Sequence, residues 1–227
     1  MQSAIVSYNR IIDFLKYPIV LVLLVSVPFM IPKLFEIIQI MIRWKDEYYP
    51  LLVGIGIYII VWKVFIKNIA NGWFSTFEHE LTHSIFALAT FHKVTNIKVT
   101  ASNGGHMNYC GVGGGNWLIT IAPYFSPTLS ALVLVVMYLA PTQFHSILLG
   151  ILGFSMAFHM HSTWHETHYG QTDLKEVGFT FAWIFLPAAN VLANIMFLSL
   201  IPNDNIYLSV VMGKYYDYCM VLFGIIF

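Results

Sequence analysis

The residues His79-Glu80-Leu81-Thr82-His83 form an HExxH pattern whose spacing suits metal-assisted hydrolysis. On a helix, two histidines four positions apart lie on one face, so both imidazoles can bind the same metal ion. Zinc suits this arrangement, because nitrogen ligands and one open coordination position lower the pKa of a bound water to about 7. The pattern therefore predicts His79 and His83 as zinc ligands and Glu80 as the general base that takes a proton from the attacking water.

The surroundings of the HExxH pattern favour a functional interpretation. Residues 73–91 are otherwise mostly apolar, and ionisable side chains at membrane depth are costly and usually functional. The alternative is a chance motif near a helix end, in which both imidazoles are merely hydrogen-bonded to neighbours.

A third protein ligand is expected, because two histidines leave a zinc ion under-coordinated. Asp173 is the candidate, since it stands just ahead of the apolar run that begins at Phe179. A chain that folds back at this point would bring the carboxylate to the two histidines. The alternative is that Asp173 only caps a helix or occupies its first turn, where the helix dipole favours an acid.

A second group of histidines lies in the polar segment 159–176. If this segment is helical, His161, His165 and His168 fall at positions i, i+4 and i+7 and share one face. One interpretation is a second polar or metal cluster, or a relay that feeds ions or protons to the first site. The other is an interfacial cap, in which Trp164 and Tyr169 belong to an aromatic belt.

The composition places these residues in a membrane protein. The 227-residue chain is 58% hydrophobic and 10% charged, whereas soluble domains carry about 25% charged residues. At about 20 apolar residues for each span, its length allows five or six transmembrane helices in a lipid bilayer. The formal net charge is zero, so no basic field indicates a nucleic-acid partner.

The predicted architecture is an all-α polytopic membrane protein with one small β-hairpin after the HExxH helix. Residues 94–100 alternate with the period of a strand, Asn103-Gly104-Gly105 is a turn signal, and residues 106–110 can return as a second strand. We expect one domain over residues 1–227, with a core at about 73–201. Apolar runs cover about residues 17–31, 51–65, 73–91, 117–139, 146–158, 179–201 and 206–227.

These features together resemble a known family. They are the HExxH helix, the strand-and-glycine segment that follows it, Ala122-Pro123 and Thr172-Asp173. In this combination the chain resembles the site-2 protease family of intramembrane zinc metalloproteases over roughly residues 73–201, and above all its compact bacterial branch. It departs from the family in lacking an Asn-Pro-Asp-Gly or Leu-Asp-Gly sequence for the third ligand, since residues 186–190 contain no acid.

The resemblance implies a multi-pass protein of a bacterial cell membrane that acts in regulated intramembrane proteolysis. Zinc would be held by His79, His83 and Asp173, and Glu80 would be the general base and then protonate the leaving amine. The substrate would be a membrane protein, cut in or near a transmembrane segment, and no motif identifies a regulatory partner.

The hairpin and its turn have two interpretations each. The strand at 94–100 would offer an edge to an unwound substrate segment, or the hairpin would only plug the site. The side chains of Asn103, His106 and Asn108 are candidates for an oxyanion donor, or they are ordinary turn residues.

Other functions use similar residues. A membrane metal-ion transporter could use a histidine pair in a membrane helix with a histidine-rich entry, and a di-iron desaturase or hydroxylase uses about eight histidines in several boxes. A non-catalytic scaffold could keep a metal site for stability. Glu80 separates these classes, because hydrolysis requires it, whereas transport or structural metal binding tolerates glutamine there.

Overall fold

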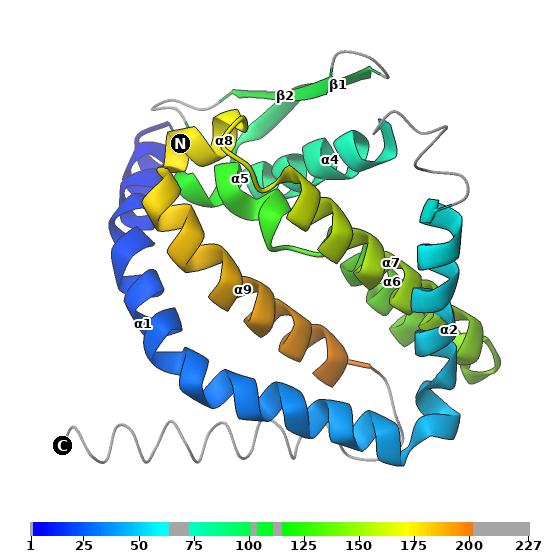
Figure 1. Cartoon of the computed structure of the whole chain (residues 1–227). Coiled ribbons are helices and arrows are strands. Elements are labelled where there is room, and N and C mark those ends of the chain that lie inside the picture. Colours follow the sequence, from blue (N-terminus) through cyan, green and yellow to red (C-terminus); the bar gives the residue numbers. More distant parts are fainter. Residues whose placement is uncertain (1, 64–72, 101–103, 111–114, 202–227) are drawn as a thin grey trace.

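The computed structural model describes residues 2–63, 73–100, 104–110 and 115–201, and this part is mostly helical (Figure 1). The predicted fold class is confirmed, including the antiparallel hairpin that directly follows the HExxH helix. The elements are α1 (Gln2–Arg43), α2 (Lys45–Val61), α4 (Trp73–Ala89), β1 (Lys93–Thr100), β2 (Gly104–Cys110), α5 (Trp117–Ile121), η2 (Ala122–Tyr124), α6 (Thr128–Leu139), η3 (Thr142–Phe144), α7 (His145–Glu166), α8 (Thr172–Val177) and α9 (Phe179–Ser199).

Three helical segments of the described part are long and apolar enough to cross a membrane: Ile5–Arg43, Thr142–Glu166 and Phe179–Ser199. A fourth candidate is the pair Trp117–Tyr124 and Thr128–Leu139, which is bent by 79°. The helices α2 and α4 have 17 residues each, or about 25 Å, slightly less than the roughly 30 Å of a hydrocarbon core. The expected apolar run at 206–227 lies outside the described residues.

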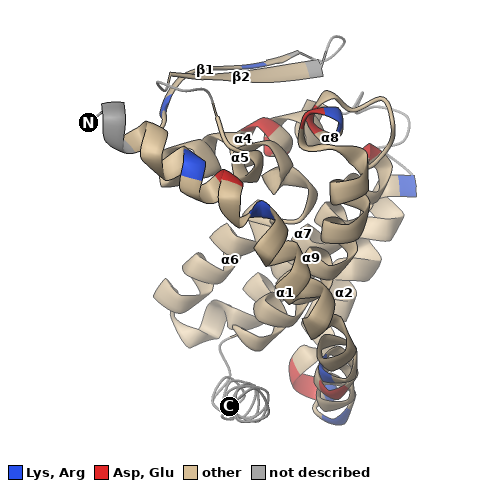
Figure 2. Cartoon of the chain, turned by 90° about the vertical axis from the view of Figure 1, so that its left-hand side faces the viewer, with Lys and Arg blue, Asp and Glu red and all other residues tan. Residues whose placement is uncertain are grey.

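Charged residues gather toward two ends of the chain and leave a wide belt of uncharged residues between them (Figure 2). One end carries the hairpin and α8, and the other carries the turn between α1 and α2. A belt of this kind matches the apolar zone of a bilayer. The HExxH helix lies at the hairpin end of the molecule (Figure 1).

Two hydrophobic clusters hold the helices together. In the first, α1 curves around α9 (Figure 1), and aromatic side chains from α5 and α9, such as Trp117 and Phe185, fill the space between them. The second joins α2, α6 and α7 around Leu51, Met137 and Leu152. The HExxH helix α4 packs mainly against the hairpin, η2 and α5.

Glycines allow the closest helix contact, which is that between α2 and α7. A Cβ atom built on Gly54 would lie 1.8 Å from the carbonyl oxygen of Gly150, and one built on Gly153 would lie 2.0 Å from that of Leu51. Small residues let helix backbones approach in this way, which strengthens van der Waals packing where the lipid offers no hydrophobic driving force.

The substitution Gly54→Ala should destabilise the fold by roughly 1–3 kcal/mol, because the added methyl group forces α2 and α7 apart. Gly56→Ala is the matched control on the same helix, since a Cβ there meets nothing within 4 Å. Unfolding of both variants in detergent, followed by circular dichroism, measures the difference. Equal stability of the two variants would contradict the packing described here.

Candidate active site

The HExxH residues lie on α4, and both histidines lie on one face of this helix. Their ring centroids are 4.7 Å apart, as expected for side chains one turn apart. The helix is anchored on its other side by Thr82, whose hydroxyl group lies 2.6 Å from that of Thr128 at the start of α6. Glu80 and His83 are buried, at 7% and 8% exposure.

Asp173 reaches the histidines from the short helix α8. It lies in the first turn of α8, while Leu174 and Val177 on the same helix are buried in the first hydrophobic cluster. Gly178 then turns the chain into α9 with a φ of 91°, a conformation that glycine adopts without steric cost. Asp173 therefore occupies a first-turn position and also points toward the histidines, so the two interpretations from the sequence are compatible.

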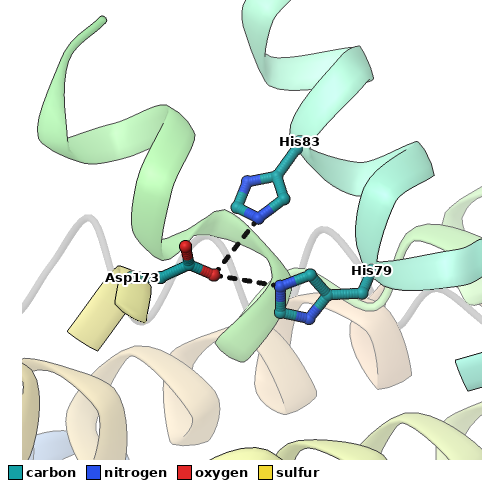
Figure 3. Close-up of side chains that lie close together, drawn as sticks. All are labelled: His79, His83 and Asp173. Atoms are coloured by element: carbon teal, nitrogen blue, oxygen red, sulfur yellow. Dashed lines mark hydrogen bonds and ion pairs between the residues drawn. The ribbon is translucent and has the colours of Figure 1, made fainter. Parts of the chain in front are cut away.

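The three candidate ligands converge on one point (Figure 3). The Asp173 Oδ2 atom lies 3.1 Å from Nε2 of His79 and 3.4 Å from Nε2 of His83. One ligand atom from each residue lies within 4.8 Å of the others. Zinc bond lengths of about 2.0–2.1 Å place two ligands of a tetrahedral site about 3.3 Å apart. Two imidazole nitrogens and a carboxylate oxygen at these separations fit a catalytic zinc site.

The outer nitrogen of each imidazole is also engaged. Nδ1 of His83 donates to the backbone carbonyl oxygen of Ile119 at 2.8 Å, and Nδ1 of His79 lies 2.8 Å from a carboxylate oxygen of Glu166. A proton on Nδ1 leaves the lone pair on Nε2, which is the atom that faces Asp173 in both residues.

The carboxylate of Asp173 is held in its ionised form. Burial opposes ionisation, but His79 and His83, when protonated, outweigh it through hydrogen bonds and charge and hold the pKa of this carboxyl well below its usual range. Tyr124 adds a further donor, since its hydroxyl group donates to Oδ2 of Asp173 at 3.2 Å. A metal ligand must be deprotonated, and the surroundings of Asp173 meet this requirement.

A cavity of about 590 Å³ opens over the three ligands. Glu80 lines it beside the histidines, and β2 forms the opposite wall with Gly105, His106, Met107 and Tyr109. The hairpin lies very close to α4 here, because a Cβ on Gly105 would lie 2.9 Å from Cγ of Glu80. The cavity thus places Glu80 next to the point where the ligands meet and leaves room for an extended peptide.

Of the second histidine cluster, only His161 and His165 lie on α7, where their ring centroids are 6.3 Å apart. His161 contacts α2, with Nδ1 2.9 Å from the Tyr58 hydroxyl group and its ring 4.5 Å from that of Trp62. His165 and His168 line the cavity, but α7 ends at Glu166, so His168 lies beyond the helix. Among the described residues, only His79, His83 and Asp173 bring three ligand atoms together.

The three candidates for an oxyanion donor differ in their location. His106 lines the cavity, and Asn103 lies outside the described residues. Asn108 accepts a hydrogen bond from Thr95 through its backbone carbonyl, which belongs to the hairpin. Of the three, His106 is the one that the structure places in the wall of the site.

Glu166 and Tyr124 were not singled out as site residues from the sequence. A weak signal existed for each, since Glu166 lies within the histidine-rich segment and Tyr124 directly follows Ala122-Pro123. Their contacts with His79 and Asp173 join residues 87 and 49 positions apart. Such contacts depend on how the helices pack, which no local pattern specifies.

The fold and the site define a membrane protein with the ligand set of a metalloprotease. The family model described as Peptidase M50B-like matches residues 51–198, more than half of the chain. The chain therefore belongs to this family, a site-2 protease family of membrane metalloproteases. Neither the curated proteins nor the solved structures contain a match to the chain. The family assignment confirms the resemblance inferred from the HExxH helix, the hairpin and Thr172-Asp173.

Removal of a ligand should abolish metal binding. We expect about one zinc ion for each wild-type chain, and loss of that ion in His79→Ala and in Asp173→Ala, because two ligands hold zinc poorly. Elemental analysis of the purified protein measures this. His145→Ala is a matched control, since His145 bonds the backbone of Met137 far from the site. Zinc retained in Asp173→Ala would contradict the assignment and move the third ligand to His165 or His168.

Proposed function

We propose that this protein is an intramembrane zinc metalloprotease that hydrolyses a peptide bond in or near a transmembrane segment of a membrane-protein substrate. The observation that carries the proposal is the convergence of both HExxH histidines with Asp173 beside a cavity that Glu80 lines. Membership of the Peptidase M50B-like family supports the reaction class. By the same resemblance we place the protein in a bacterial cell membrane and in regulated intramembrane proteolysis.

The site residues have two roles, metal binding and proton transfer. His79, His83 and Asp173 would hold zinc, which when bound supplies Lewis acidity and lowers the pKa of water. Glu80 lines the cavity next to both histidines. Its carboxylate accepts a proton from the attacking water and then passes that proton to the leaving amine.

The substrate segment would lie along β2. A helix must open before its peptide bond can be attacked, and an extended segment can add to the edge of a sheet through main-chain hydrogen bonds. In the two-stranded sheet, β2 pairs with β1 along one edge, and β2 is the strand that lines the cavity. This favours β2 as the strand to which the substrate segment pairs. The sequence pattern had suggested the strand at residues 94–100 for this role.

The rival functions receive less support from the described residues. A di-iron site needs more histidine ligands than the two that meet Asp173. His92 is hydrogen-bonded to Asn9 and Thr90, and His145 to the backbone of Met137. Most histidines outside the site thus have structural partners, which favours a single metal centre.

The substitution Glu80→Gln should abolish cleavage and leave zinc binding intact, because glutamine cannot accept the proton. We expect a fall in rate of roughly 10²–10⁴-fold, measured with a single-span peptide substrate in proteoliposomes. The control is Glu47→Gln, which should cleave like the wild type. Glu47 lies in the first turn of α2, and the turn between α1 and α2 lies at the opposite end of the molecule from α4 (Figure 1).

Three results would contradict the hydrolase proposal. They are wild-type cleavage by Glu80→Gln, two irons in each purified chain, and zinc uptake into vesicles that Glu80→Gln does not alter. The second would indicate an oxygenase and the third a transporter.

The close approach of β2 to α4 gives a second test. Gly105→Ala adds a Cβ that would lie 2.6 Å from Cγ2 of Thr76 and 2.9 Å from Cγ of Glu80. The hairpin or Glu80 must shift, so we expect cleavage to slow by roughly tenfold or more, with zinc content unchanged. Adding Thr76→Ser removes the closer contact and should restore part of the rate. Full activity of Gly105→Ala would show that the hairpin does not position Glu80.

A further inference from the structure

Glu166, the last residue of α7, uses both carboxylate oxygens to join α7 to the site. Its Oε2 atom lies 2.8 Å from Nδ1 of His79. Its Oε1 atom accepts hydrogen bonds from the hydroxyl groups of Ser75 and Ser162, the latter at 3.1 Å. The carboxylate is therefore fixed at one end by two serines and presents its other oxygen to a candidate metal ligand.

Three of these residues, Ser75, Ser162 and Glu166, form a closed ring of hydrogen bonds between two helices, and His79 is joined to this ring through Glu166. Ser75 and His79 are four positions apart on α4, and Ser162 and Glu166 are four positions apart on α7, so each pair shares one helix face. The two serine hydroxyl groups lie 2.6 Å apart and complete the ring. The ion pair between His79 and Glu166 is mostly buried, with 12% of the His79 side chain and 20% of the Glu166 side chain exposed. Each of the three ring members is thus held by its two neighbours in the ring, and Glu166 passes this constraint on to His79.

The two ligand histidines are held by different acceptors. His83 donates Nδ1–H to the backbone carbonyl of Ile119, which carries no charge and cannot change rotamer. His79 instead faces a carboxylate supplied by another helix. On the Nδ1 side, the orientation of His79 therefore depends on the side chain of Glu166, while that of His83 depends on the course of the backbone at Ile119.

We propose that Glu166 is a positioning residue that holds His79 in the tautomer and orientation in which Nε2 binds the metal, and that Ser75 and Ser162 hold Glu166 in place. The inference rests on the proposed zinc site and assigns a role to a residue outside its ligand set. A carboxylate that accepts Nδ1–H keeps the lone pair on Nε2 and increases its basicity. In the low dielectric of a buried site this interaction is stronger than in water.

The test is the zinc dissociation constant of the full-length protein in detergent, measured by competition with a chelating dye. Loss of an outer partner of a metal-bound histidine weakens metal affinity by roughly 10–100-fold, and we expect this for Glu166→Ala. Glu166→Gln should give an intermediate affinity, because its amide oxygen can still accept from Nδ1 but carries no charge. Glu47→Gln is the matched control, since Glu47 lies in the first turn of α2 and outside the cavity, and its affinity should be unchanged.

A second variant separates positioning from a general loss of structure. Ser75→Ala with Ser162→Ala keeps the carboxylate and removes its anchors, so zinc affinity should fall less than in Glu166→Ala. Circular dichroism and thermal unfolding show which variants are folded. If Glu166→Ala is not folded, the double serine variant takes its place in the measurement of zinc affinity.

The positioning role would be overturned if folded Glu166→Ala bound zinc as tightly as the wild type. If Glu166→Ala does not fold, the same result in the double serine variant would overturn it. Either result would leave the protease proposal intact. A wild-type protein that binds no zinc would overturn both.

Discussion

The structure depends on the cost of placing ionisable groups in a largely apolar molecule. A charged side chain within a membrane protein must be paired or must line a water-filled cavity. Here Asp173 and Glu166 lie on either side of His79 and contact both of its ring nitrogens. Each acid has further donors, from Tyr124 for Asp173 and from two serines for Glu166. The charged groups thus satisfy one another at one end of an otherwise apolar bundle.

The irregular parts of the fold supply the partners of this site. The bent pair α5–α6 leaves the helical course at Pro123 and Pro127, and this segment carries both the Ile119 carbonyl and Tyr124. The short helix α8 is separated from α9 by Gly178, which lets Asp173 turn inward while α9 packs against α1. Straight helices throughout would not bring these groups to α4. The long regular helices in turn hold the irregular segments in position.

The parts of the fold that local patterns describe were predictable from the sequence. The helical spacing of His79 and His83, the alternation in residues 94–100 and the turn before β2 all depend on neighbours in the chain. Asp173 could be proposed because the number of zinc ligands demands a third donor. Glu166 and Tyr124 could not be, because their roles depend on how α7 and η2 pack against α4. The shared helix face that a helical segment would give His161, His165 and His168 holds for the first two and does not extend to His168, since α7 ends at Glu166.

The wide separation of the ligands along the chain has a thermodynamic consequence. His79 and Asp173 are 94 positions apart, so an ion bound to both closes a loop of that length, as a covalent cross-link would. A cross-link across a long loop lowers the entropy of the unfolded chain, and an ion that binds only the folded state adds its binding free energy to stability. With zinc bound as proposed, metal loading and assembly of the helix bundle are coupled, and the ion adds its binding free energy to the stability of the folded protein.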